Sequence, residues 1–168
     1  MEVLFSEEQI AKRVRELGKE ISADYQGKTV HFICVLKGAY TFLADLARAM
    51  EVPVTLDFLA VSSYGKGKTS SGEVQLTKDL DVSIAGRDVI VVEDIADTGL
   101  TLNYLLNMLR SREPATLKVA AFLSKPSRRE IDVAVDYIGF EVPDRFVVGY
   151  GLDDNQRFRE LPYIAVQD

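Results

Sequence analysis

The chain has 168 residues, 47% of them hydrophobic and 27% charged, which suits one soluble globular domain around a single core. Twenty basic and 26 acidic side chains give a net charge of −6, which argues against a protein that binds nucleic acid by neutralising phosphates. Cys34 is the only cysteine, so an intrachain disulfide and a cysteine-based metal cluster are excluded. The sequence has neither a signal-peptide pattern nor the roughly 18 apolar residues that span a membrane, so we expect a cytoplasmic protein.

The apolar pattern predicts helices and strands in alternation. Helical spacing predicts helices over 6–22, 39–50 and 101–112, and Ser6 with Gln9 forms a capping box at the start of the first. Apolar runs rich in β-branched residues predict strands at 29–36, 54–63, 87–92, 115–123, 134–138, 146–149 and 164–166. Residues 64–75 have the composition of an exposed loop. This order predicts one α/β domain, residues 1–168, with a central, largely parallel sheet flanked by helices.

Three polar segments each follow a predicted strand, namely Lys37-Gly38, the acidic cluster of Glu93, Asp94 and Asp97, and Ser124-Lys125. Ligands of open α/β sheets bind beyond the carboxyl ends of the strands. We therefore expect these segments to converge on one site.

Two common phosphate-binding motifs do not fit the sequence. Gly67-Lys68-Thr69 looks like the end of a P-loop, but Ser62 stands where that motif needs a glycine, and no helical pattern follows. The dinucleotide-binding pattern G-x-G-x-x-G does not occur either.

The segment DTGLT, residues 97–101, joins a predicted buried strand to a predicted helix. Unpaired N–H groups and the positive end of the dipole make a helix start suitable for a phosphate. Gly99 allows the backbone to approach a ligand closely, and Thr98 and Thr101 can donate hydroxyl hydrogen bonds. Alternatively, Asp97 or Thr98 serves only as a helix cap.

A cap does not account for the two carboxylates that precede this turn, Glu93 and Asp94. Adjacent carboxylates suit the vicinal hydroxyls of a ribose or a hydrated magnesium ion. We interpret the whole segment as a site for a ribose 5-phosphate, with the phosphate on the turn and the diol at the acid pair.

A hydrophobic strand, two acids and D-T-G-x-T resemble the diphosphoribosyl-binding signature of type I phosphoribosyltransferases. The stretches "VLKGAYTFLADL", "SSYG", "LSKPSRR", "VDYIGFEVPDRFVVGYGLD" and "RELPYI" extend the resemblance to the bacterial hypoxanthine-guanine phosphoribosyltransferases. The resemblance implies magnesium-dependent transfer of the 5-phosphoribosyl group from phosphoribosyl diphosphate to N9 of hypoxanthine or guanine, giving IMP or GMP and diphosphate in purine salvage. It also implies a small hood formed by the terminal segments, and a homodimer or homotetramer.

The resemblance assigns roles in the ribose and phosphate half of the site. Glu93 and Asp94 match the acids that hold the ribose hydroxyls and their hydrated magnesium. The 5-phosphate cradle is matched by Thr98, Gly99, Leu100 and Thr101. Asp97 matches the general base that faces N7 of the purine.

The diphosphate and the lid are matched by segments far apart in the sequence. Lys37-Gly38 resembles the loop whose N–H groups meet the leaving diphosphate, although Lys37 by itself reads as a solvated lysine. Asp153 matches the carboxylate that binds a second magnesium, and Arg159 matches a distal diphosphate contact. Ser63-Tyr64 matches the start of a mobile loop that closes over the reacting centre.

The base is matched by three residues. Lys125 corresponds to the lysine that donates to O6, Phe146 to the aromatic ring that stacks on the purine, and the Val147 backbone to a contact with the pyrimidine edge. From the residues alone, Lys125 reads as solvated and Phe146 as part of the core. Asp154 departs from the family, which commonly has an aromatic residue there, and this puts the conformation of its loop in doubt.

Three other functions compete with this interpretation. A non-catalytic sensor that regulates transcription would carry an added DNA-binding segment, and an RNA-binding regulator would show a basic face, which the charge of −6 disfavours. A pyrimidine or adenine transferase is disfavoured by "KPSRR" followed by "VGYGLD".

Overall fold

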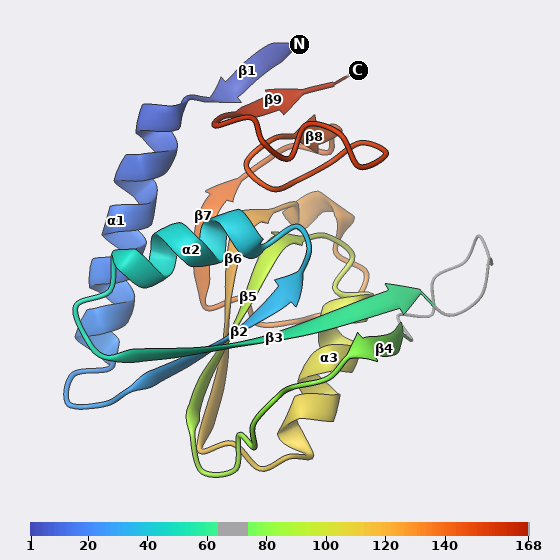
Figure 1. Cartoon of the computed structure of the whole chain (residues 1–168). Coiled ribbons are helices and arrows are strands. Elements are labelled where there is room, and N and C mark those ends of the chain that lie inside the picture. The colour runs from blue at the N-terminus through green and yellow to red at the C-terminus, as the bar shows by residue number, and fades with distance from the viewer. Residues whose placement is uncertain (64–73, 168) are drawn as a thin grey trace.

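The computed structural model describes residues 1–63 and 74–167 (Figure 1). Its helices are α1 (Glu7–Asp24), α2 (Tyr40–Arg48), α3 (Leu100–Arg110) and the short 3₁₀ helix η1 (Pro126–Arg128). Its strands are β1 (Glu2–Phe5), β2 (Val30–Leu36), β3 (Val54–Ser63), β4 (Val74–Lys78), β5 (Asp88–Ala96), β6 (Thr116–Ser124), β7 (Tyr137–Glu141), β8 (Val147–Val148) and β9 (Ile164–Val166). The predicted α/β class is confirmed.

The main sheet has six strands in the order β4-β3-β2-β5-β6-β7 within the described residues. The strands from β3 to β7 pair in parallel, and only the edge strand β4 pairs antiparallel, with β3. The largely parallel sheet predicted from the sequence is therefore present. Because β2, β5 and β6 are adjacent parallel strands, they end at the same edge of the sheet, and the polar segments near their carboxyl ends are brought together there.

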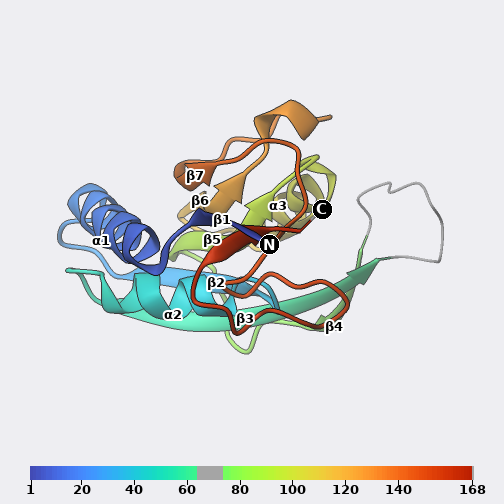
Figure 2. The same ribbon diagram turned by 90° about the horizontal axis from the view of Figure 1, so that it is seen from above.

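The sheet is covered by helices on both faces, and the alternation of side chains along β2 and β5 shows why. Phe32 and Cys34 face a core shared with α1 and α2, whereas Ile33 and Val35 face a second core shared with α3. Figure 2 shows α1 and α2 on one side of the sheet and α3 on the other. Strands buried on both faces need continuous apolar runs, which is the pattern that predicted them.

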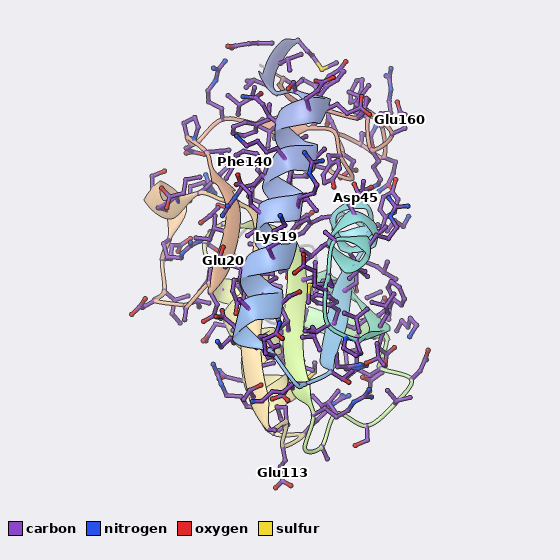
Figure 3. The ribbon with its side chains drawn as sticks, turned by 90° about the vertical axis from the view of Figure 1, so that its left-hand side faces the viewer. Lys19, Glu20, Asp45, Glu113, Phe140 and Glu160 are labelled. Atoms are coloured by element: carbon purple, nitrogen blue, oxygen red, sulfur yellow. The ribbon has the colours of Figure 1, made fainter. Side chains whose placement is uncertain are left out.

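The helix α1 begins as predicted, because Ser6 Oγ accepts from the backbone N–H of Gln9 and the Gln9 side chain accepts from the backbone N–H of Ser6. Figure 3 looks onto this helix, with Lys19 on its exposed face and Phe140 of β7 beside it. Arg13 fastens α1 to β7 by donating to two backbone carbonyls of that strand at 2.8 and 2.7 Å. No described helix combines the length and the apolar composition needed to cross a bilayer.

A second sheet joins the two ends of the described chain (Figure 1). It has the order β1-β9-β8, with β9 antiparallel to both neighbours. The short strand β1 was not predicted, because its side chains are largely exposed and its pairing partner lies at the other end of the chain. The strand β4 was also not predicted.

The bounds of β5 correct one sequence interpretation. The apolar run predicted a strand ending at Val92, with the acid pair after it. The strand continues to Ala96, because Glu93 pairs with Ala121 of β6 and Ile95 with Leu123. The acid pair is therefore part of a paired strand, and only Asp97 follows it.

Candidate active site

A pocket of about 250 Å³ lies where β5 and β6 end, below the segment that includes β8. Its lining residues are Asp94, Ile95, Asp97, Lys125, Phe146, Val147, Leu152 and Asp153. All of them except Ile95 and Leu152 were predicted as site residues, from three separate stretches of sequence. A larger cavity of about 680 Å³, between α1, α2 and residues 159–162, is lined by none of the three acids Glu93, Asp94 and Asp97.

The acid pair is strongly desolvated. Glu93 is 9% exposed and Asp94 is half-buried. Burial raises the pKa of Glu93 well above its ordinary value, and the neighbouring Asp94 charge raises it further. Burial also raises the pKa of Asp94; the nearby Arg159 guanidinium opposes this rise and Asp153 adds to it. The charged form of the pair therefore needs a cation or several hydroxyl donors.

The carboxylates of the site provide only part of the ligands of a magnesium ion. Among residues 1–63 and 74–167, no three histidine, cysteine, aspartate or glutamate side chains are arranged to hold a metal by themselves. Magnesium in enzymes commonly takes one or two carboxylates and completes its octahedron with water and substrate phosphates. Asp94 and Asp153 line one pocket and supply carboxylates of this kind. The residues fit an ion that shares its ligands with a phosphorylated substrate.

The segment after β2 packs directly on the acid pair. A side chain at Gly38 would overlap the Asp94 carboxylate, so only glycine allows this approach. Gly151, at φ 98°, packs in turn against the Gly38 carbonyl group. The Leu36–Lys37 peptide bond is cis, and Lys37 is exposed. The structure therefore brings together the Lys37-Gly38 segment, the acid pair and the loop after β8.

The turn between β5 and α3 has the geometry of an open helix start. Gly99 is the N-cap residue, at φ 88°, and it provides no side chain that could cap the helix. Thr98 Oγ1 accepts from the Leu100 N–H at 3.3 Å, and the Thr98 carbonyl accepts from the Glu130 N–H at 2.9 Å. Thr101 lies in the first turn of α3 and is partly exposed. Asp97 is not the N-cap residue, so the alternative that Asp97 only caps the helix is wrong, whereas Thr98 does accept from the first N–H of the helix.

The Asp97 carboxylate instead pairs with an arginine from the turn after β6. Arg128 Nε donates to Asp97 Oδ1 at 2.6 Å. Arg129 holds the same residue from the other side: its Nη1 donates to the Asp97 carbonyl at 2.5 Å and its Nη2 to Ser124 Oγ at 2.9 Å. The sequence predicted no role for either arginine of "KPSRR", because partners separated by 31 and 32 positions leave no local signal of their pairing.

The base half of the pocket contains the lysine and the aromatic ring. Lys125 is 8% exposed, so the alternative that it is a solvated lysine is wrong. Its ammonium lies 4.0 Å from Asp144 Oδ1, an ion pair that was not predicted. Phe146 is 51% exposed and lines the pocket, so the alternative that it belongs to the core is also wrong. Val147 follows in β8, where it pairs with Val166.

The loop after β8 presents Asp153 to the pocket. Asp153 Oδ2 accepts from the Gln156 N–H at 2.8 Å and lies 3.4 Å from Arg159 Nη2. Arg159 Nη1 donates to the Gly151 carbonyl at 2.7 Å, which closes the loop. The unusual Asp154 accepts from Gln167 Nε2 at 2.9 Å, so its carboxylate is bound to the chain end after β9. Ser63 ends β3, and Tyr64 lies outside the described residues.

Comparison with known proteins places this geometry in a family. The phosphoribosyl transferase domain model matches residues 2–155. A hypoxanthine-guanine phosphoribosyltransferase of Bacillus subtilis is 52% identical over 164 residues, covering 98% of this chain and 91% of the relative. One from Mycobacterium avium is 49% identical over 172 residues, covering 99% and 85%.

The fold agrees with this relationship. A crystal structure of a hypoxanthine-guanine phosphoribosyltransferase from Bacillus anthracis superposes with a TM-score of 0.97 at 45% identity, covering 100% of this chain and 99% of that one. The chain therefore belongs to the phosphoribosyltransferase family, in the group of the hypoxanthine-guanine phosphoribosyltransferases.

Proposed function

We propose that the chain transfers the 5-phosphoribosyl group of phosphoribosyl diphosphate to N9 of hypoxanthine or guanine, giving IMP or GMP and diphosphate. One observation carries this proposal: Asp94 and Asp97 at the end of β5, the buried Lys125 and the exposed Phe146 line the same pocket. An acid pair next to an open helix start suits a ribose phosphate, and a donor beside an aromatic ring suits a 6-oxopurine. The ribose phosphate and the base would therefore bind next to each other in one pocket.

The ribose phosphate would lie along the end of β5. Its 5-phosphate would accept hydrogen bonds from the backbone N–H groups and hydroxyls of residues 98–101, where the helix dipole adds favourable charge. Its hydroxyls would donate to Glu93 and Asp94. Because the ribosyl carbon becomes positively charged in the transition state, these carboxylates also favour the reaction electrostatically.

The diphosphate would lie between the acid pair and the loop after β8. N–H groups of Lys37 and Gly38 would meet the leaving group, because Gly38 is already packed on Asp94. We propose magnesium as the cofactor, held by Asp153 and the acid pair, where it would neutralise the leaving diphosphate. Arg159, which pairs with Asp153, would add a cation at the distal end.

The base would stack on Phe146 with its pyrimidine edge against the Val147 backbone. Lys125 would donate to O6, and Asp97 would accept the proton of N7. A carboxylate is a weak base, but N7–H becomes acidic as N9 bonds to the ribosyl carbon, so the proton needs to move only late in the step. Binding in this orientation places N9 on the side of the ribose.

We extend the proposal to the whole molecule. The chain would act as one domain over residues 1–168, in the cytoplasm, as a homodimer or homotetramer. The sheet formed by β1, β9 and β8 would serve as the hood, since the residue before β8 and the first residue of β8 line the pocket.

The test is nucleotide formation with phosphoribosyl diphosphate, magnesium and each nucleobase in turn. We expect more product from hypoxanthine and guanine than from adenine, and none without magnesium. Asp97→Asn keeps the shape and the acceptor for Arg128 but loses the base, so its turnover should fall roughly 10²–10⁴-fold while phosphoribosyl diphosphate binding is retained. Asp132→Asn, which neutralises an exposed aspartate that does not line the pocket, is the control. Full turnover in Asp97→Asn would remove Asp97 from the mechanism.

A further inference from the structure

Two residues outside the predicted site connect the group that would read O6 with the group that would read N7. Lys125 Nζ lies 4.0 Å from Asp144 Oδ1, and the same oxygen lies 3.5 Å from Arg128 Nη1. Arg128 Nε then donates to Asp97 Oδ1 at 2.6 Å. The four side chains alternate in charge from Lys125 to Asp97 and form a continuous chain, which we call the recognition chain.

The buried end of the recognition chain is Lys125. Among residues 1–63 and 74–167, its ammonium makes no hydrogen bond, and Asp144 is its one ion-pair partner. A buried ammonium has to be compensated, and its position follows its counter-ion. Asp144 is therefore the described carboxylate that attracts the Lys125 ammonium toward its place in the pocket.

The other end leaves Asp97 ready for a ligand. Arg128 occupies Oδ1, whereas no described residue donates to Oδ2. The planar guanidinium uses Nε for Asp97 and Nη1 for Asp144, so one rigid group sets the separation of the two carboxylates. O6 and N7 lie on the same edge of a purine, so this spacing matters for a base that has to meet both groups.

We propose that Arg128 and Asp144 are positioning residues for base recognition, which hold Lys125 and Asp97 at the separation that one 6-oxopurine requires. This inference rests on the proposed function. Neither residue touches the reacting atoms. Their contribution is to keep two charged groups, from the ends of different strands, in a single arrangement before the base arrives, so that the base does not have to organise them.

The simpler interpretation is an ordinary surface ion pair. Arg128, Asp97 and Asp144 are all substantially exposed, and exposed pairs contribute little to stability. The two interpretations give different kinetics, because an ordinary ion pair has no reason to affect the base more than the phosphoribosyl diphosphate.

The experiment is steady-state kinetics of Arg128→Gln, Asp144→Asn and the double variant. Hypoxanthine is varied at saturating phosphoribosyl diphosphate, and phosphoribosyl diphosphate is then varied at saturating hypoxanthine. We expect the KM for hypoxanthine to rise about tenfold in each single variant, as for a misplaced binding group. The KM for phosphoribosyl diphosphate should stay within about twofold of wild type. The KM for hypoxanthine should rise no further in the double variant than in the more impaired single variant, because both changes interrupt the recognition chain.

Two further variants separate positioning from charge and from folding. Arg128→Lys keeps the positive charge but lacks the planar, two-sided guanidinium. Its KM for hypoxanthine should therefore lie between those of wild type and Arg128→Gln. Arg112, which follows the end of α3, donates to the Asp79 carboxylate at 2.8 and 3.0 Å and forms an ion pair of similar exposure. Arg112→Gln breaks this pair and should leave both KM values unchanged. Thermal unfolding of every variant checks that the fold is kept.

The outcomes distinguish failure of the proposed function from failure of the positioning role alone. A wild-type chain that forms no nucleotide from either 6-oxopurine overturns the proposed function and this inference with it. If the wild type is active but Arg128→Gln keeps its hypoxanthine KM, or loses affinity equally for both substrates, the inference alone is overturned. A loss in Arg112→Gln equal to that in Arg128→Gln also overturns it.

Discussion

Replacing Lys125 by methionine removes a buried donor while keeping most of the side-chain volume. Lys125 is 8% exposed, so water has little access to take the place of its ammonium. Asp144 does not become an orphan in this variant, because Arg128 Nη1 remains 3.5 Å from the same carboxylate oxygen. The substitution therefore tests recognition of the base with little disturbance of the surrounding charges.

The magnitude follows from the hydrogen-bonding groups at position 6 of the purine. An ammonium only donates, so it pairs with the carbonyl of hypoxanthine or guanine and opposes the amino group of adenine. Leaving a buried donor unpaired costs about 1–3 kcal/mol, and more when it is charged. A difference of about 2 kcal/mol corresponds to roughly 30-fold in kcat/KM. Wild type should therefore prefer hypoxanthine to adenine by at least about tenfold, and Lys125→Met should lose most of that preference.

The assay is direct competition between hypoxanthine and adenine with limiting phosphoribosyl diphosphate, followed by separation of the nucleotides formed. Affinity for phosphoribosyl diphosphate is measured in parallel and should change little, because Lys125 lies in the base half of the pocket. Lys12→Met, on the exposed side of α1, controls for the loss of one positive charge. If Lys125→Met keeps the full preference of wild type for hypoxanthine, Lys125 does not read O6.

Three further predictions concern the acids. Burial raises the pKa of Glu93 above its value in the unfolded chain, so the contribution of this one group to the stability of the ligand-free protein is fully present below the unfolded-state pKa and is lost as the pH rises through the folded-state pKa. Glu93→Gln should therefore melt about 2–4 °C higher than wild type at pH 8 in EDTA and show a flatter pH dependence, and an unchanged slope would contradict this. Asp153→Ala should need more magnesium for half-maximal rate, whereas an unchanged titration would place Asp153 outside the metal site. Asp57 accepts hydrogen bonds from the backbone N–H groups of Phe58, Asp81 and Val82 at 2.8–3.2 Å. Asp57→Ala should therefore lower the free energy of unfolding, measured in urea, by about 2–4 kcal/mol, and Asp57→Asn should lower it less.

The sequence by itself was sufficient for the features that depend on neighbouring residues. The capping box of Ser6 and Gln9 marked the start of α1, and the apolar run of β2 marked a strand buried on both faces. The segment DTGLT pointed to an open helix start, where Gly99 indeed takes a positive φ. Each of these signals lies within a few residues, because helix capping, turn conformation and side-chain periodicity are local properties of the chain.

The tertiary structure decided the features that depend on which strands are neighbours. Whether β5 stopped at Val92 or continued past the acid pair was set by its pairing with β6, and β1 became a strand only because β9 lies beside it. The pairing of Asp97 with Arg128 spans 31 positions and exists because the turns after β5 and β6 end at the same edge of the sheet. Sequence shows which side chains are available for chemistry, but the distances between them follow from the order of strands in the sheet, and that order is fixed by burial of the whole core rather than by any single segment.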